Sequence, residues 1–386
     1  MQNQLPKNPF FTKGEIPDDF FCDRVEETRR LIRHSTNGQD VVLSASRRVG
    51  KTGLIMHCFH QPELADEYYT FFVDILETSS LREFTYTLGR EIFEKLKPRS
   101  KKMTELFMRT VTSISSEFKY DYLSGMPKFN FSIGALRHPD TTLAEIFEYI
   151  DKADKRCLIA IDEFQQICHY PEKNIEALLR TYIQHCNNAD FIFAGSERHI
   201  LAEMFNLPSR PFYASTAQMS LDPINLDVYE NFVVQNYERY GKQVDRSVVR
   251  MVYDLFDGNT FCLQKVFNVA FGMTAQEALC DESIVNDALD DILQEEERNY
   301  QNRLSLLTPK PKELLYAIAS EKESSRLTSG DFVRHHHLSS PSSVQSATKQ
   351  LLENDWITYR LDEKGNKIFS LSDQFLSLWI RRKFAN

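Results

Sequence analysis

The sequence lacks the features that mark several classes of protein. No apolar run approaches the roughly 20 residues that a membrane-spanning helix needs, so we expect no membrane insertion. The start, MQNQLPKNPFF, has no basic segment followed by an apolar stretch, and we therefore expect no secretory signal. The 7 cysteines are dispersed and form no C-x-x-C pair, which favours reduced thiols in a cytoplasmic protein over a disulfide framework.

An excess of positive charge is also absent. The net charge of −9 gives no global attraction to nucleic acid. A hydrophobic share of 42% with 26% charged residues argues against disorder, and 386 residues suffice for two or three domains. From Leu306 onward, however, 12 lysines and arginines outnumber 9 acidic residues, so contact of this last part with DNA stays open.

What the sequence does contain is a phosphate-loop pattern, SASRRVGKTGL, after the apolar run 41–43. It fits G-x-x-x-x-G-K-[ST] except at Ala45, which replaces the first glycine and is tolerated where φ is negative. In such a loop backbone N–H groups hold phosphate oxygens, Lys51 reaches the β- and γ-phosphates, and Thr52 ligates Mg²⁺. We therefore expect ATP and Mg²⁺ as cofactors, held by Ala45, Ser46, Arg47, Arg48, Val49, Gly50, Lys51 and Thr52.

Two further strand ends supply candidate catalytic residues. In RCLIAIDEF, Asp162 ends a buried apolar strand and is expected to ligate Mg²⁺, while Glu163 is expected to polarise the attacking water. In FIFAGSERH, Ser196 is a candidate contact for the γ-phosphate or the water. An N-cap of the helix that follows is an equally good interpretation of Ser196.

The order of the expected elements predicts the fold class. Strands alternate with helices up to about residue 220, which is typical of an α/β fold with a parallel sheet covered by helices on both faces. We assign 1–220 to a P-loop ATPase core, with 95–137 as an insertion that contains an irregular hairpin. Residues 221–305 are expected to form a separate group of successive helices. Three helices and a hairpin in 306–386 predict a winged helix.

These motifs together resemble the archaeal-type ATPases of the STAND branch of P-loop NTPases, which are related to AAA+ proteins and also occur in bacteria. The resemblance covers nearly the whole chain, and we expect a bacterial member. It rests on NPF, FFCDR, RRVGKT, IAIDEFQQI with YPEKN, FAGSERHILAEMF, RPFYASTAQMSLDPI, GNTFCLQKVFN and SLSDQFLSLWIRR. It implies an ATPase core, a helical lid formed by 221–305 and a winged helix, with Pro9, Phe10 and Arg24 near the adenine and Arg47 and Arg48 as paired loop arginines.

The chain departs from this family at three places. Ala45–Ser46 replaces Gly-Pro, 213–215 reads Tyr-Ala-Ser where many members carry an arginine shortly after the tyrosine, and 258–260 reads Gly-Asn-Thr instead of G-x-P. The last two departures argue against fast hydrolysis and against tight coupling of nucleotide to lid position. Arg210 is a candidate replacement for the cation that stabilises γ-phosphate charge, and a solvated loop arginine is the alternative.

The leading functional hypothesis is an ATP-hydrolysing switch whose winged helix carries output to double-stranded DNA or to a protein partner. The alternatives are a non-catalytic nucleotide-binding module and a DNA-binding ATPase that resembles origin-recognition proteins. A nucleotide-dependent homo-oligomer is also considered. The run 335–337 is histidine throughout, but adjacent helical residues diverge by about 100° and no acid stands at ligand spacing, so we expect a partly exposed helix end and no metal site.

Overall fold

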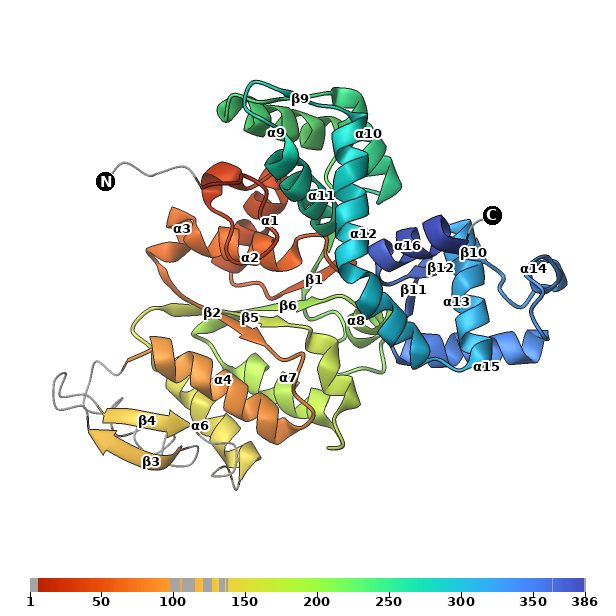
Figure 1. Ribbon diagram of the computed structural model, residues 1–386. Helices are drawn as coiled ribbons and strands as arrows, with labels where there is room; N and C mark the ends of the chain where they lie inside the picture. Colours follow the sequence, from red (N-terminus) through yellow and green to blue (C-terminus); the bar gives the residue numbers. More distant parts are fainter. Residues whose placement is uncertain are drawn as a thin grey trace. The chain divides into compact units, whose positions relative to one another are not determined.

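The computed structural model describes residues 6–97, 105, 115–120, 127–131, 136, 138–362 and 364–384 (Figure 1). The chain divides into two compact units. The first is Glu15–Pro223, and the second joins Ile224–Asn386 to the N-terminal residues up to Gly14. The two units are described in turn.

The first unit is built on a five-stranded sheet with the strand order β2-β5-β6-β1-β7. All of its strand pairs are parallel. β5 and β6 are buried on both faces, which explains their near-continuous apolar sequences. The α/β fold with a parallel sheet is therefore confirmed, with strands β1 (Val41–Ala45), β2 (Tyr68–Asp74), β5 (Arg156–Asp162), β6 (Ala189–Gly195) and β7 (Ala217–Leu221).

Helices cover both faces of this sheet (Figure 1). One face packs on a cluster that includes Leu31, Leu54 and Ile55, from the helices α1 (Val25–Thr36) and α2 (Lys51–His60), with α3 (Pro62–Ala65) beside them. The opposite face packs on a larger aromatic-rich cluster, to which the contributing helices are α4 (Leu81–Lys95), α6 (Pro139–Asp151), η3 (Phe164–His169), α7 (Ile175–His185) and α8 (Arg198–Asn206). A short helix, η1 (Asp18–Phe20), precedes α1.

A separate hairpin lies within the predicted insertion. β3 (Ser115–Tyr120) pairs with β4 (Pro127–Phe131) in antiparallel fashion, with a register shift between residues 115 and 117. The irregular hairpin expected here is therefore confirmed. Most other residues of 95–137 lie outside the described residues.

The second unit begins with a group of helices, α9 (Leu226–Arg239), α10 (Arg246–Leu255), α11 (Thr260–Met273) and α12 (Glu282–Ser305). A short parallel pair that the sequence did not indicate, β8 (Gln243–Val244) with β9 (Leu279–Cys280), joins two of their connections. Phe10 is buried among the rings of Phe232, Tyr237, Phe267 and Phe271. This burial explains why the N-terminal arm groups with the second unit, whereas the sequence analysis placed it in the core.

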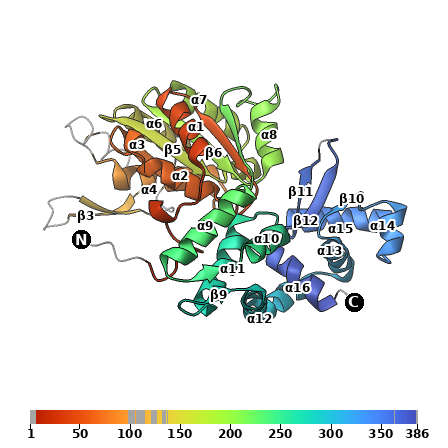
Figure 2. The same cartoon turned by 90° about the horizontal axis from the view of Figure 1, so that it is seen from above.

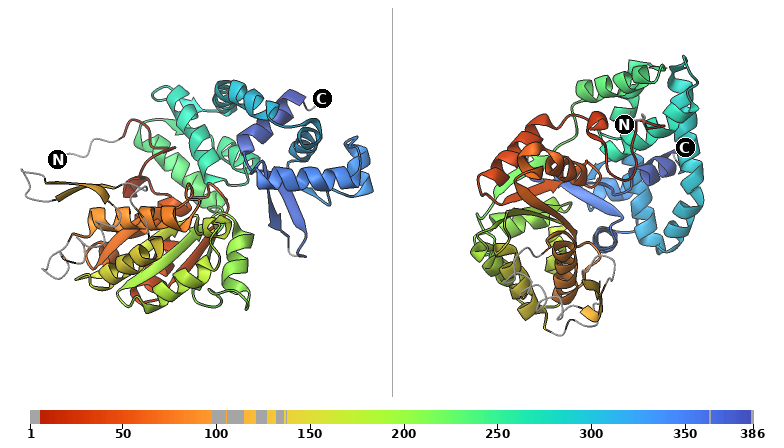
Figure 3. Two further views of the ribbon diagram at one scale, coloured as in Figure 1. Left: turned by 90° about the horizontal axis from the view of Figure 1, so that it is seen from below. Right: turned by 90° about the vertical axis from the view of Figure 1, so that its left-hand side faces the viewer.

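The C-terminal part of this unit is a winged helix (Figures 2 and 3). Its small antiparallel sheet has the order β10-β12-β11, and Gly365 adopts the positive φ of +78° in the turn between β11 and β12. The predicted three helices and hairpin are confirmed, as α13 (Pro309–Glu321), β10 (Ser324–Ser325), α14 (Gly330–His335), α15 (Pro341–Glu353), β11 (Ile357–Leu361) and β12 (Lys367–Leu371), with α16 (Gln374–Phe384) closing the chain. Among the described residues, no helix combines the length and apolar character that crossing a membrane requires.

Candidate active site

The predicted phosphate loop connects β1 to α2. Ala45 is the buried last residue of β1 and has the extended backbone of a strand, so the condition for tolerating its methyl group is met. Gly50 has φ +96° and precedes the first residue of α2 without a side chain that could cap the helix. Arg48 also adopts a left-handed conformation, with φ +66°. The loop thus presents the first amides of a helix at the carboxyl edge of the sheet, which is a favourable place for an anion.

Two carboxylates converge on the loop lysine. Lys51 Nζ lies 2.7 Å from Asp162 Oδ1 and 3.1 Å from Glu163 Oε1. Thr52 Oγ1 donates to Asp162 Oδ2 at 2.9 Å. The side chains of Lys51 and Asp162 are 8% and 7% exposed, so both charges are largely desolvated. The structure therefore brings together four of the residues that the sequence analysis assigned to the site.

The position of Lys51 explains why it needs these acids. It is the first residue of α2, where the positive end of the helix dipole disfavours a cation. Asp162 and Glu163 compensate both for this repulsion and for the burial of the ammonium group. Phosphate oxygens can supply the same negative charge at the same place.

Glu163 is held in an unusual backbone conformation directly after β5. Its φ of +55° and ψ of +42° place it in the left-handed region, which is uncommon for a residue with a side chain. Its Oε2 accepts hydrogen bonds from Gln165 Nε2 at 2.6 Å and from Ser196 Oγ at 2.8 Å. Burial raises the pKa of Glu163, but Lys51, Gln165 and Ser196 together outweigh burial and hold the pKa below its ordinary value. Glu163 is therefore a carboxylate at neutral pH.

The contacts of Ser196 distinguish its two interpretations. Both its hydroxyl and its backbone N–H donate to Glu163 Oε2, the latter at 3.2 Å. The N-cap of α8 is Glu197, so Ser196 does not cap that helix. Ser196 lies at the site, beside the acid expected to act on water.

Gln165 and Gly195 are site residues that the sequence analysis missed. Gln165 is 2% exposed and packs against β6 at its last residue, Gly195. A Cβ at residue 195 would lie 2.1 Å from Gln165 Oε1 and 2.8 Å from Leu201 Cδ1. Only glycine leaves room for Gln165 to reach Glu163. Gln165 lies in the segment DEFQQ and Gly195 in FAGS, but no local sequence pattern indicates that the two residues are in contact.

Asp74 is a third residue that was missed. It ends β2 and lies in register with Asp162 on β5. Burial and the negative charges of Asp162 and Glu163 raise the pKa of Asp74 above its ordinary value. The sequence signal was available, because VDIL ends an apolar strand in an acid just as IDEF does.

Arg24 supports the loop from outside. Its guanidinium is buried and donates to the carbonyl oxygens of Val49, at 3.3 Å, and Asp222, at 2.8 Å. It also pairs with Glu27 at 2.8 Å. Arg24 therefore contacts the loop backbone, and its expected place near an adenine stays a prediction.

The remaining predicted residues are the N-terminal Pro9 and Phe10, Arg210, and three residues of the loop. Pro9 and Phe10 belong to the second unit. Arg210 forms ion pairs with Glu176 at 2.8 Å and with Glu203 at 3.7 Å. Its expected contact with a γ-phosphate stays a prediction. Ser46, Arg47 and Arg48 are exposed on the loop.

The oxygen atoms beside the loop suit Mg²⁺. This ion takes oxygen ligands at about 2.0–2.1 Å in an octahedron, which sets neighbouring ligands about 2.9 Å apart. Thr52 Oγ1 and Asp162 Oδ2 have this separation of 2.9 Å. A hydroxyl and a carboxylate are also the hard donors that Mg²⁺ prefers. The two residues fit neighbouring positions on one ion.

Two family models match the chain. Residues 21–266 match an ATPase domain predominantly from Archaea. Residues 298–382 match a probable winged helix domain. No protein with curated annotation matches the chain.

Solved structures share the fold over nearly the whole length. The Walker-type ATPase PABY2304 of Pyrococcus abyssi is 17% identical, with a TM-score of 0.64 over 97% of this chain and 99% of that one. The ORC2 protein of Aeropyrum pernix, in ADPNP–ADP complexes, is 14% identical, with a TM-score of 0.54 over 100% and 98% of the two chains. The ORC1 protein of the same organism, in complex with DNA, is 13% identical, with a TM-score of 0.53 over 98% and 97%.

Proposed function

The chain belongs to the family of ATPase domains predominantly from Archaea, and on that premise we propose that it is a slow, Mg²⁺-dependent, ATP-hydrolysing molecular switch. Its assignment to bacterial members of the STAND branch is part of the proposal and rests on the motif resemblance. The triphosphate binds along residues 45–52 at the start of α2. The observation that carries the proposal is the convergence of Lys51, Asp162 and Glu163 at the carboxyl edge of the sheet.

The chemistry follows from the contacts of these side chains. Lys51 exchanges its carboxylate partners for β- and γ-phosphate oxygens, and Thr52 and Asp162 would hold Mg²⁺. Mg²⁺ neutralises charge on the phosphates when it is bound. The Glu163 carboxylate accepts a hydrogen bond from water and orients it toward the γ-phosphorus. Oε2 of Glu163 already accepts hydrogen bonds from Ser196 and Gln165. The other oxygen of Glu163, Oε1, which faces Lys51, is therefore the one that orients the water.

Nucleotide binding is tested by calorimetry with a non-hydrolysable ATP analogue and Mg²⁺. Replacing Lys51 by Ala removes a charge-assisted contact worth about 1.5–3 kcal/mol, so affinity falls at least about tenfold. The matched control is Lys349→Ala, which removes a lysine that is 78% exposed on α15 and leaves affinity unchanged. Undiminished affinity in Lys51→Ala would place the nucleotide elsewhere and refute the proposal.

A non-catalytic nucleotide-binding module is the second candidate. Residues 258–260 lack the family's lid proline, and Asn259 instead caps α11 by accepting from the backbone N–H of Cys262. Phosphate release from ATP separates the two candidates. The switch predicts turnover above that of Glu163→Gln. Equal rates of phosphate release for the wild-type protein and Glu163→Gln, with and without double-stranded DNA, would favour the non-catalytic module.

We propose that the winged helix carries the output, to double-stranded DNA or to a protein partner. The excess of 12 basic over 9 acidic residues after Leu306 and the similarity to an ORC1 protein solved with DNA support an initiator-like contact with DNA. Gel-shift assays at two salt concentrations test it, because phosphate contacts give steep salt dependence. Absence of binding at low salt would leave a protein partner as the output.

Two further parts of the proposal concern the state of the protein in the cell. A nucleotide-dependent homo-oligomer would let a neighbouring chain supply the arginine that many family members carry shortly after the tyrosine corresponding to Tyr213. Light scattering with and without the ATP analogue tests it. The 7 cysteines are free thiols, which supports a reducing compartment such as the cytoplasm.

A further inference from the structure

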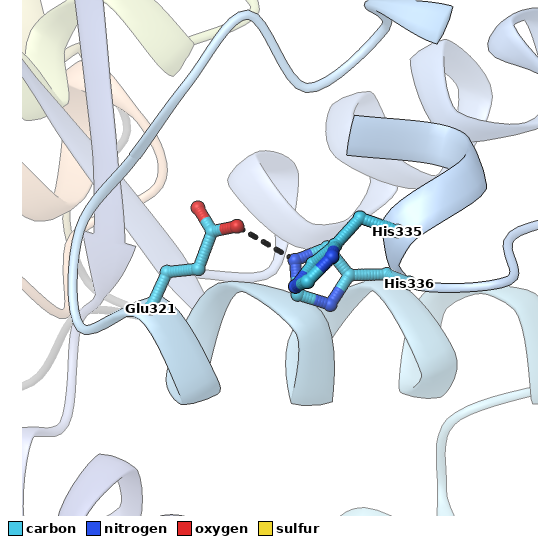
Figure 4. A group of neighbouring side chains, drawn as sticks. All are labelled: Glu321, His335 and His336. Atoms are coloured by element: carbon cyan, nitrogen blue, oxygen red, sulfur yellow. Dashed lines mark hydrogen bonds and ion pairs between the residues drawn. The ribbon is translucent and has the colours of Figure 1, made fainter. Parts of the chain in front are cut away.

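A second cluster of ligand-type side chains lies in the winged helix (Figure 4). Glu321 ends α13, His335 ends α14, and His336 follows it. Each side chain offers one ligand atom, and these atoms lie within 4.8 Å of one another. This cluster shares no residue with the proposed nucleotide site, and its chemistry does not depend on the proposed function.

The expectation that no acid accompanies the histidines is wrong. Glu321 stands 14 residues before His335 in the sequence, and α13 and α14 bring the two together. The histidines also approach one another, because the helix ends at His335 and His336 leaves it with φ −95° and ψ +12°. Their ring centroids are 4.7 Å apart, with an angle of 86° between the rings.

Neighbouring groups already orient two of the three side chains. Glu321 Oε1 lies 2.7 Å from His336 Nε2. The other carboxylate oxygen, Oε2, accepts a hydrogen bond from Ser324 Oγ at 2.7 Å, which turns Oε1 toward the ring. The His336 ring packs on Phe332, with centroids 4.5 Å apart. Supporting contacts of this kind fix the orientation of ligands in metal sites.

The distances are close to those of a zinc site. Zn²⁺ binds imidazole nitrogen and carboxylate oxygen at about 2.0–2.2 Å, so tetrahedral ligand atoms stand about 3.4 Å apart. An upper separation of 4.8 Å closes to this value by rotation of side chains, and His335 is exposed and able to turn. We propose that Glu321, His335 and His336 bind one divalent transition-metal ion, Zn²⁺ foremost, with the fourth position open to water.

The ligand types select the metal and predict a structural effect. Two imidazoles with one carboxylate suit Zn²⁺, Co²⁺ and Ni²⁺, whereas Mg²⁺ and Ca²⁺ prefer oxygen alone. A bound ion would join the end of α13 to the end of α14 and so close the segment 321–336. This segment leads to α15, the helix next in the chain, so the ion would reduce local opening within the winged helix.

The test uses the full chain and three proteins. Co²⁺ titration followed by visible absorption, and Zn²⁺ competition against a chromogenic chelator, measure affinity and stoichiometry. The wild-type protein binds one ion at this site, and His335→Ala loses affinity at least about tenfold, because even supporting residues of metal sites contribute that much. His337→Ala, the matched control, removes an exposed histidine outside the cluster and retains wild-type affinity.

A second readout locates the ion. Hydrogen exchange of residues 321–336 slows when Zn²⁺ is added to the wild-type protein and to His337→Ala, and is unaffected in His335→Ala. Circular dichroism verifies that each variant is folded. Absence of binding, equal affinity in His335→Ala, or protection confined to other segments would each overturn the proposal.

Discussion

A buried ionic network lies in each of the two units, and the two differ in which charge is buried. In the first unit the cation is buried, and its acidic partners are buried with it: Lys51 is 8% exposed, Asp162 7% and Glu163 16%. In the second unit the anion alone is buried. Glu230 on α9 is 4% exposed, and the arginines that reach it from α10 are about half exposed.

This difference separates a structural ion cluster from the proposed binding site. Arg246 and Arg250 keep part of each side chain in water while they contact Glu230, so this cluster joins α10 to α9 at low desolvation cost. Lys51 has no such freedom at the start of α2. Its burial beside two acids is an arrangement in which one set of anions can replace another. The first network should therefore affect activity, and the second should affect stability.

The largest expected effect comes from making the same Glu-to-Gln substitution in each of the two ionic networks. Glu163→Gln keeps the shape of the side chain and removes the proposed general base, so we expect the rate of phosphate release to fall about 10²- to 10⁴-fold. Glu230→Gln makes the same chemical change in the other network. It leaves that rate unchanged and lowers the free energy of unfolding by about 1–2 kcal/mol, through weaker hydrogen bonds to the arginines.

Phosphate release under saturating ATP and urea unfolding of both variants measure the two halves. Glu163→Gln should also retain affinity for ATP, which shows that the loop remains intact. A loss of turnover in Glu230→Gln that equals the loss in Glu163→Gln would show that the two networks do not have separate roles.

The second prediction compares one glycine from each unit. Gly195→Ala places a methyl group where Gln165 Oε1 and Leu201 Cδ1 now lie, so the side chain of Gln165 must leave Glu163. We expect a loss of about 1–3 kcal/mol in unfolding free energy and about tenfold lower turnover. Gly272→Ala on α11 meets no atom within 4 Å, and alanine is the better helix former, so stability rises by up to about 1 kcal/mol.

Urea unfolding and phosphate release check the glycine pair. Equal stability changes in the two variants would mean that the close approach of Gln165 to β6 does not matter. A stable Gly195→Ala protein with normal turnover would show that the hydrogen bond from Gln165 does not position Glu163 for catalysis.

The part of the site that is local in sequence was predictable. Loop residues Gly50, Lys51 and Thr52 form one contiguous sequence motif, and the pair Asp162–Glu163 follows an apolar strand. A parallel sheet places such strand ends at one edge, so their meeting followed from the fold class. Strands β1, β2, β5 and β6, most of the core helices, and the three helices and hairpin of the winged helix followed from periodicity in the same way, whereas strand β7 and helix α16 were not predicted.

What the sequence did not reveal depends on contacts between distant residues. Gln165 becomes a site residue only because β6 presents a glycine beside it. Glu321 becomes a partner of His336 only because α13 and α14 end at the same place. The N-terminal arm belongs to the second unit because Phe10 packs among aromatic rings there, and no local sequence pattern predicts these contacts.

The third prediction concerns pH and joins the two networks. The pKa values of Glu163 and Glu230 are both lower in the folded protein than their ordinary value, since burial, which raises each pKa, is outweighed by Lys51 and its neighbours in one case and by the arginines in the other. A depressed carboxyl pKa contributes stability that is present above the unfolded value of 4.5 and is lost as pH falls through the folded pKa. Unfolding free energy should therefore decrease below about pH 4.5.

Urea unfolding between neutral pH and about pH 3 measures this loss. Glu230→Gln should flatten the acid limb relative to the wild-type protein, because one of the contributing carboxyls is gone. A parallel curve for this variant would show that Glu230 has the same pKa in both states.

The smallest expected effect has opposite signs in the two units. The pKa of Asp74 is raised, by burial and by the charges of Asp162 and Glu163, so the folded protein disfavours its ionised form. Asp74→Asn removes that repulsion and keeps an oxygen that can accept from the backbone N–H of Leu76. Because Asp74 is only partly withdrawn from solvent, the gain in unfolding free energy at neutral pH is only a few tenths of a kcal/mol, and it disappears as pH falls through the folded pKa and the wild-type carboxyl becomes neutral. Asp331→Asn is the matched change in the first turn of α14. A negative charge there interacts favourably with the helix dipole, so stability falls slightly instead.

Chemical unfolding of both variants at neutral pH tests this prediction. A loss of stability in Asp74→Asn would mean that Asp74, the third acid at the sheet edge, stabilises the site as a counter-charge to Lys51 and is not destabilised by repulsion from the other two acids.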